Sequence, residues 1–269
     1  MDWIQATSIA LIQGLTEFLP ISSSAHLLFP SLLLGWPDQG LTFDVAVHLG
    51  SLLAVVIYLR RDLISMVQGL WQWQQEKSLN PQATLALMLI VATLPAVFFG
   101  LVLKDWIEVN ARALWVVAAT TLGFGLLLGW ADWRSRRQHD LAAMSWRHTL
   151  AIGLAQALAL VPGTSRSGIT MTAALMLGYT REAAARFSFL MSIPVILAAS
   201  SLMSLELVIS PVTVDWVPML LAFGVSFASA WACIVLFMQI ISILGMWPFV
   251  IYRIVLGVGL CWLLLPTLS

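Results

Sequence analysis

The chain has 269 residues, of which 60% are apolar and 10% charged, and thirteen Lys and Arg residues balance thirteen Asp and Glu residues. A soluble domain carries about 25% charged residues, so the mean hydropathy of +0.93 excludes a soluble enzyme and a disordered chain. Without a basic excess, a nucleic-acid partner is not expected. We therefore expect an all-α polytopic membrane protein, folded as a single membrane domain over residues 1–269.

Six stretches have the length and apolar character of membrane-spanning helices, which need about 20 residues. They cover residues 42–59, 83–103, 113–131, 187–209, 216–241 and 248–265. The first Lys or Arg is Arg60, so no basic segment precedes the first apolar stretch. We therefore do not expect a cleaved signal peptide.

Two further apolar stretches, residues 3–19 and 148–161, are interrupted at Pro20 and at Pro162. The second has about 14 residues, which as a helix reach about 21 Å and do not cross a bilayer. The short apolar helices expected after these breaks cover residues 24–34 and 167–178. We predict two re-entrant helix hairpins, whose non-helical turns need protein or water around them at membrane depth.

The two predicted hairpins are similar in sequence. Residues 11–15 (LIQGL) match residues 154–158 (LAQAL), and residues 34–36 (LGW) match residues 177–179 (LGY), both at an offset of 143 positions. Between these anchors the alignment slips by one position and pairs Pro20 with Pro162 and Ser22-Ser23 with Thr164-Ser165. This similarity predicts an internal repeat.

The Lys and Arg residues gather in alternate loops, and basic loops face the cytoplasm. The basic segments are residues 60–77, 134–147 and 181–186, whereas residues 35–41 and 210–215 contain no Lys or Arg. The first hairpin then enters from the outside and the second from the cytoplasm. The halves, about 1–133 and 146–269, form an inverted-topology repeat, in which broken helices typically meet near the membrane midplane.

The turn of the second hairpin, residues 162–170 (PGTSRSGIT), combines glycines, hydroxyls and one Arg at a helix start. Amides at a helix N-terminus and the helix dipole favour an anion, and a guanidinium suits phosphate or carboxylate. The alternative is that Arg166 only satisfies buried carbonyl groups, although an Arg at membrane depth usually indicates function. The predicted anion-binding residues are Gly163, Thr164, Ser165, Arg166, Ser167, Gly168 and Thr170.

The first hairpin carries Gln13 and Glu17 on one face of its first helix, four positions apart. An acid beside Pro20 at the bottom of an apolar hairpin is costly unless something compensates its charge. Glu17 is therefore expected to be metal-bound, paired with Arg166 or protonated.

The second helix of this hairpin carries Ser23 and, three positions later, His26. Together with a nearby carboxylate, these residue types allow nucleophilic, acid–base and metal-binding roles. Ser22 and Ser24 are most simply interpreted as residues that cap the helix.

Residues 13–23 (QGLTEFLPISS) with His26, and residues 162–168 (PGTSRSG), resemble the undecaprenyl-diphosphate phosphatases of the bacitracin-resistance type. The resemblance covers the whole chain in length, span count and motif order. It implies hydrolysis of undecaprenyl diphosphate, which recycles the carrier lipid for peptidoglycan synthesis and confers bacitracin resistance. It also implies a location in the bacterial inner membrane, an active site that opens toward the periplasm, and a requirement for Mg²⁺ or Ca²⁺.

The resemblance implies a role for each residue that matches its motifs. Glu17 matches the essential acid, which we also expect to bind the metal ion, and Ser23 matches the hydroxyl proposed as nucleophile. His26 matches the essential histidine and Arg166 the diphosphate-binding arginine. We complete the expected substrate-binding set with Gln13, Ser22 and Thr170. Because position 13 is Gln, a metal site with two carboxylates at positions 13 and 17 is not available.

Several alternatives stay open at this point. Either Ser23, activated by His26 or Glu17, or an activated water attacks the terminal phosphorus. A lipid-phosphate flippase or secondary transporter on the same inverted repeat also needs an anion site. The SR-x5-H-x3-D motif of another lipid-phosphatase family is excluded, because Thr172 stands where that motif requires His. The oligomeric state is open, a homodimer included.

Overall fold

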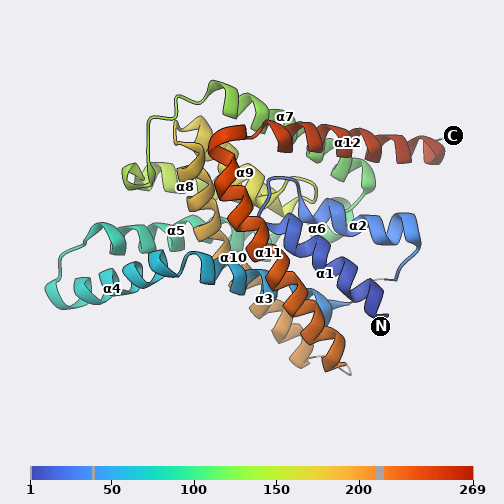
Figure 1. The fold of residues 1–269 in the computed structure, drawn as a ribbon, viewed down its shortest axis with the longest axis horizontal. Coiled ribbons are helices and arrows are strands. Elements are labelled where there is room, and N and C mark those ends of the chain that lie inside the picture. The colour runs from blue at the N-terminus through green and yellow to red at the C-terminus, as the bar shows by residue number, and fades with distance from the viewer. Residues whose placement is uncertain (1, 38–39, 210–214, 269) are drawn as a thin grey trace.

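The computed structural model describes residues 2–37, 40–209 and 215–268, and within these segments the regular elements are all helices (Figure 1). The first half contains α1 (Trp3–Glu17), α2 (Ser23–Leu34), α3 (Leu41–Tyr58), α4 (Arg60–Glu76), α5 (Pro81–Val102), α6 (Lys104–Asn110) and α7 (Leu114–Arg134). The second contains the short 3-10 helix η1 (Leu141–Ala143), α8 (Trp146–Ala157), the 3-10 helix η2 (Leu158–Leu160), α9 (Arg166–Met176), α10 (Arg181–Ile209), α11 (Trp216–Leu244) and α12 (Trp247–Leu268).

Six of these helices are long and apolar enough to cross a membrane, which confirms the predicted spans. They are α3, α5, α7, α10, α11 and α12. Large apolar side chains on them point outward, as Leu94 and Phe98 of α5 do with exposed fractions of 57% and 60%. Such outward-facing apolar surface is what lipid contact requires, so the protein is an all-α polytopic membrane protein.

The basic segment 60–77, expected as a loop, is largely the helix α4. It follows α3 after Leu59 alone and lies beside α5 (Figure 1). Its exposed apolar side chains, Ile64, Val67 and Trp71, recur at helical spacing, as in an amphipathic helix at a membrane surface. The segment is therefore both basic and helical. Its charge can still be used to predict its side of the membrane.

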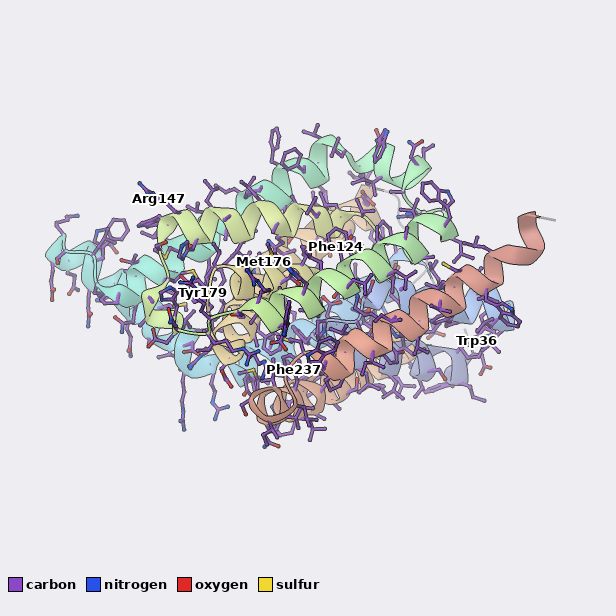
Figure 2. All side chains as sticks on the ribbon, turned by 90° about the horizontal axis from the view of Figure 1, so that it is seen from above. Trp36, Phe124, Arg147, Met176, Tyr179 and Phe237 are labelled. Carbon is purple, nitrogen blue, oxygen red and sulfur yellow. The ribbon has the colours of Figure 1, made fainter. Side chains whose placement is uncertain are left out.

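Two helix pairs stand where the hairpins were expected. α1 and α2 are joined by residues 18–22, and α8 with η2 is joined to α9 by residues 161–165. Figure 2 shows Trp36, just after α2, and Arg147, at the start of α8, at opposite ends of the long axis. This placement suits hairpins that enter from opposite sides, and their entry into a membrane stays a prediction.

The start of the second helix corrects the alignment of the two hairpins. Ser22 directly precedes α2 with a φ of 74°, and Ser165 directly precedes α9 with a φ of 70°, an unusual conformation for a residue with a side chain. These positions are 143 apart, so Ser22 and not Ser23 corresponds to Ser165. The predicted slip that paired Pro20 with Pro162 is therefore wrong, because the turn conformation, not the proline, defines the equivalent positions.

Helices of each half pack against helices of the other half. α1 and α3 pack against α11 of the second half, and α8 and α10 pack against α5 of the first half. α7 and α12 pack against each other. Small residues allow close approach: a Cβ on Gly14 would lie 2.6 Å from the Ser226 carbonyl oxygen, and one on Gly153 would lie 2.5 Å from that of Ala92. Reciprocal packing is what an internal repeat predicts.

Candidate active site

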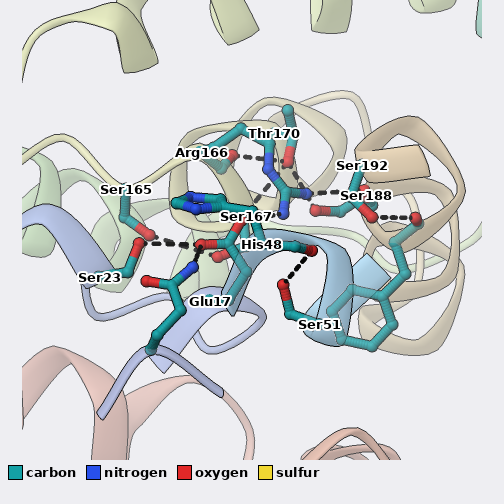
Figure 3. A network of polar contacts seen from close by, with 12 residues as sticks. Glu17, Ser23, His48, Ser51, Ser165, Arg166, Ser167, Thr170, Ser188 and Ser192 are labelled. Carbon is teal, nitrogen blue, oxygen red and sulfur yellow. Dashed lines mark hydrogen bonds and ion pairs between the residues drawn. The ribbon is translucent and has the colours of Figure 1, made fainter. Parts of the chain in front are cut away.

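Glu17, the last residue of α1, is the centre of the polar network in Figure 3. Its Oε2 accepts hydrogen bonds from Gln13 Nε2 and from the Ser23 hydroxyl, both at 3.0 Å. Its Oε1 accepts a hydrogen bond from Arg166 Nη2 at 3.1 Å, and both side chains are largely buried. Of the three states expected for Glu17, the structure shows the pair with Arg166.

Arg166, the first residue of α9, contacts three elements of the fold. Besides Glu17, its guanidinium donates to the Ser188 carbonyl oxygen of α10 at 3.2 Å and lies 5.9 Å from the centre of the Phe18 ring. Thr170, one helical turn on, is fully buried, and its hydroxyl hydrogen-bonds that of Ser188 at 2.7 Å. The hydrogen bonds to Glu17 and Ser188 thus hold the Arg166 guanidinium beside the turn of the first hairpin.

The Ser24 hydroxyl of the first hairpin bonds the turn of the second hairpin. Gly163 N donates to Ser24 Oγ at 3.2 Å, and Ser24 Oγ hydrogen-bonds Ser22 Oγ at 3.1 Å. Ser22 stands at the capping position, but neither serine hydroxyl accepts a backbone N–H of α2, so the expected capping bonds are absent. The two hydroxyls bond each other instead. Gly163 has a φ of +87°, and a Cβ there would lie 2.2 Å from Thr120 Oγ1. The turn therefore requires glycine.

The start of α9 leaves donors for an anion. Ser165 Oγ accepts from Gly168 N at 3.1 Å, and the Ser167 hydroxyl donates to the Leu19 carbonyl oxygen at 2.8 Å. Within the described segments, the amides of Arg166 and Ser167 have no hydrogen-bond acceptor. Thr164 is fully buried, and its hydroxyl has no partner. Two free amides at a helix N-terminus are suited to an anion, as the sequence predicts for this turn.

His26 is directed away from the expected nucleophile. Its Nδ1 lies 2.7 Å from the Ser22 carbonyl oxygen and its Nε2 lies 2.6 Å from Tyr252 Oη of α12. A carbonyl oxygen only accepts, so Nδ1 carries hydrogen, and in the neutral ring Nε2 accepts from the Tyr252 hydroxyl. The Ser23 hydroxyl instead donates to Glu17. The structure thus joins Glu17, Ser23 and Arg166 and leaves His26 as a neighbour of the turn.

The chain resembles known proteins over nearly its whole length. Residues 6–259 match the family described as bacitracin resistance protein BacA. The chain belongs to this family. An undecaprenyl-diphosphatase of Chromohalobacter salexigens is 56% identical over 260 residues, covering 97% of this chain and 98% of the relative. One of Alcanivorax borkumensis is 57% identical with the same coverage.

Three residues near the BacA-type motifs were not found by sequence reasoning. Ser188 looks like any small residue of an apolar helix, and Tyr252 like one of many interfacial aromatics. Arg253, however, is an Arg within a predicted span, which by itself indicates function or a buried polar partner. It is fully buried and contacts both turns.

The oxygen atoms beside Glu17 suit a hard divalent cation only in part. Among the described residues, no group of three or more His, Cys, Asp or Glu side chains is close enough to hold a metal ion. Gln13 Oε1, however, is buried and has no hydrogen-bond partner, and its amide is bonded to Glu17. Mg²⁺ is often bound by one or two carboxylates plus substrate phosphates, and Ca²⁺ accepts amide oxygens. In this BacA-family chain, Glu17 offers one carboxylate and Gln13 one unpartnered amide oxygen, so a cation here would need further ligands from the substrate.

Proposed function

We propose that this chain hydrolyses undecaprenyl diphosphate to undecaprenyl phosphate and inorganic phosphate. Both relatives carry the name undecaprenyl-diphosphatase and align over 97% of this chain. The observation that carries the proposal is the joint contact of Ser23 and Arg166 with the Glu17 carboxylate. It combines a nucleophile, a proton acceptor and a phosphate ligand. The reaction recycles the carrier lipid for peptidoglycan synthesis and so confers bacitracin resistance.

The anion site of the second hairpin binds the diphosphate, and the lipid tail lies between helices in the bilayer. Arg166 and the free amides of Arg166 and Ser167 hold the terminal phosphate. As Arg166 turns to the phosphate, its hydrogen bond to Glu17 is replaced. Glu17 is then free to accept a proton from Ser23, which already donates to it at 3.0 Å.

The Ser23 oxygen then attacks the terminal phosphorus. A bond forms between Ser23 Oγ and phosphorus, the bond from phosphorus to the bridging oxygen breaks, and undecaprenyl phosphate leaves with that electron pair. Glu17 passes the serine proton to the leaving undecaprenyl phosphate and is again a carboxylate. It then accepts a proton from a water molecule that attacks the phosphoserine phosphorus. The bond from phosphorus to Ser23 Oγ breaks, Glu17 returns the proton to Ser23, and inorganic phosphate is released. Phosphoryl transfer depends mainly on positioning and charge neutralisation, which Arg166 and the helix start supply.

Glu17, with Gln13 Oε1, would hold a divalent cation, Mg²⁺ or Ca²⁺. When bound, the cation neutralises negative charge on the diphosphate and helps to orient it. Substrate and water would supply the remaining ligands, because no group of three or more His, Cys, Asp or Glu side chains gathers anywhere in the described residues.

The active site opens toward the periplasm of the bacterial inner membrane. The support is the loop charge: the turn of the first hairpin follows a segment without Lys or Arg, whereas residues 134–147 carry four Arg residues.

Phosphate release from undecaprenyl diphosphate by the detergent-solubilised protein tests the proposal. A hydrolase releases phosphate without a membrane, whereas a flippase or transporter on the same repeat moves lipid across vesicles and releases none. We expect release with the wild-type chain and at least 100-fold less with Arg166→Ala, which removes the phosphate ligand. No release by the folded wild-type protein in the presence of Mg²⁺ or Ca²⁺ overturns the proposal.

A further inference from the structure

Arg253 of α12 has an unusual set of partners for an arginine in an apolar helix. It is fully buried, and each of its five N–H donors has a backbone carbonyl acceptor. The acceptor residues are Pro20, Thr120, Thr121, Gly163 and Thr164. Within the described segments no carboxylate pairs with it, so its charge is balanced by carbonyl dipoles alone.

The acceptors belong to both hairpin turns. Nη1 donates to the Pro20 carbonyl oxygen of the first turn at 3.4 Å and to that of Thr164 in the second turn at 3.0 Å. Nη2 donates to the Gly163 carbonyl oxygen at 2.9 Å. The bonds to Thr120 and Thr121 fix the same guanidinium to α7. One planar group thus joins both turns to the adjacent helix.

The neighbouring helices leave space for this side chain. A Cβ on Gly125 of α7 would lie 2.9 Å from the Arg253 Cβ, and one on Gly168 of α9 would lie 3.2 Å from Arg253 Nη1. Larger residues at either position would displace the guanidinium. The geometry therefore depends on a matched set of residues and not on Arg253 alone.

We propose that Arg253 is a positioning residue of the phosphatase reaction: its guanidinium fixes the register of the two hairpin turns. The first turn lies between Glu17 and Ser23, and Arg166 follows Thr164 by two positions. Arg253 therefore sets the distance across which Ser23 and Glu17 meet Arg166, without touching the reacting atoms. A displacement of about 1 Å at such a site lowers turnover on the order of 100-fold. The inference rests on the proposed function.

The variant Arg253→Lys tests the hydrogen-bond geometry of the guanidinium while the positive charge is kept. An ammonium keeps the positive charge but has three donors, so at least two carbonyl groups lose their partner. We expect kcat to fall about 10- to 100-fold with KM within about threefold of the wild-type value, because the anion site itself is unchanged. The matched control is Arg181→Lys, which disturbs a partly buried arginine, bonded to Asp132 at 2.6 and 2.7 Å. Its kcat is expected to stay within about twofold.

Hydrogen–deuterium exchange provides a readout that does not depend on turnover. In Arg253→Lys, peptides that cover residues 18–24 and 161–169 should exchange faster together, whereas in Arg181→Lys they should not. Wild-type kcat in Arg253→Lys, or unchanged exchange in both turns, overturns the inference. If the wild-type protein releases no phosphate, the proposed function fails, while faster exchange still shows that Arg253 joins the turns.

Discussion

Glu17 Oε1 accepts a hydrogen bond from Arg166 Nη2 at 3.1 Å, although 149 positions separate the two residues in the chain. The pair joins the end of α1 to the start of α9, so the acid of one hairpin and the anion ligand of the other meet at one point. The pair holds both side chains in place. In the proposed reaction, the diphosphate competes with Glu17 for Arg166.

Glu17 and Gln13 share a hydrogen bond but should differ in their contribution to turnover. Glu17→Gln removes the proton acceptor and the charged partner of Arg166, so we expect kcat to fall at least 100-fold. Gln13→Ala removes one hydrogen bond to Glu17 and a neutral cation ligand, and should cost about tenfold. Steady-state phosphate release measures both. Equal losses would contradict a base or metal role for Glu17.

Arg166→Lys should weaken substrate binding, because lysine keeps the charge but loses the planar fork that contacts phosphate at two points. We expect KM to rise at least tenfold, equivalent to about 1.4 kcal/mol. Arg186→Lys is the control, since Arg186 bonds Asp62 at a more exposed position. An unchanged KM in Arg166→Lys would exclude bidentate binding by this residue.

Ser23→Ala distinguishes attack by serine from attack by water. If Ser23 is the nucleophile, turnover is abolished while substrate still binds, and acid-quenched wild-type enzyme with terminally labelled substrate contains phosphoserine. A water mechanism retains measurable turnover, because losing one hydrogen-bond donor typically costs about 10²–10³-fold. Ser31→Ala, an exposed serine on the same helix, should keep wild-type activity. Full activity in Ser23→Ala would remove Ser23 from the reaction.

Removal of divalent cations with a chelator should abolish phosphate release, and Mg²⁺ or Ca²⁺ should restore it. Because Gln13 Oε1 is a buried oxygen without a partner, Gln13→Ala should raise the cation concentration needed for half-maximal activity. A titration of the metal in both proteins measures this shift. Full activity in the presence of the chelator would show that charge neutralisation comes from the protein alone.

Cysteine labelling tests the orientation. Residues 110 and 138 are both exposed, and loop charge places the first in the periplasm and the second in the cytoplasm. Asn110→Cys and Gln138→Cys, each in a background without Cys233 and Cys261, should react with an impermeant thiol reagent from opposite sides. Labelling of both from one side would contradict the inverted-topology repeat.

The sequence by itself determined the spans, the two breaks and the residue types of the motifs. Hydropathy and length located the six spans, because lipid requires apolar residues along a whole helix. Pro20 and Pro162, each followed by a polar turn, marked the two breaks. The glycines, hydroxyls and Arg of residues 162–170 indicated an anion site. All of these signals are local in the chain.

The tertiary structure alone decided which of these residues meet. His26 follows Ser23 by three positions, yet the turn directs its ring to Tyr252 of α12, and the Ser23 hydroxyl bonds Glu17. Arg253 satisfies carbonyl groups that lie 89, 90 and 233 positions away. Such contacts depend on how each helix is rotated and how closely it approaches its neighbours, and that is set by packing across the whole bundle.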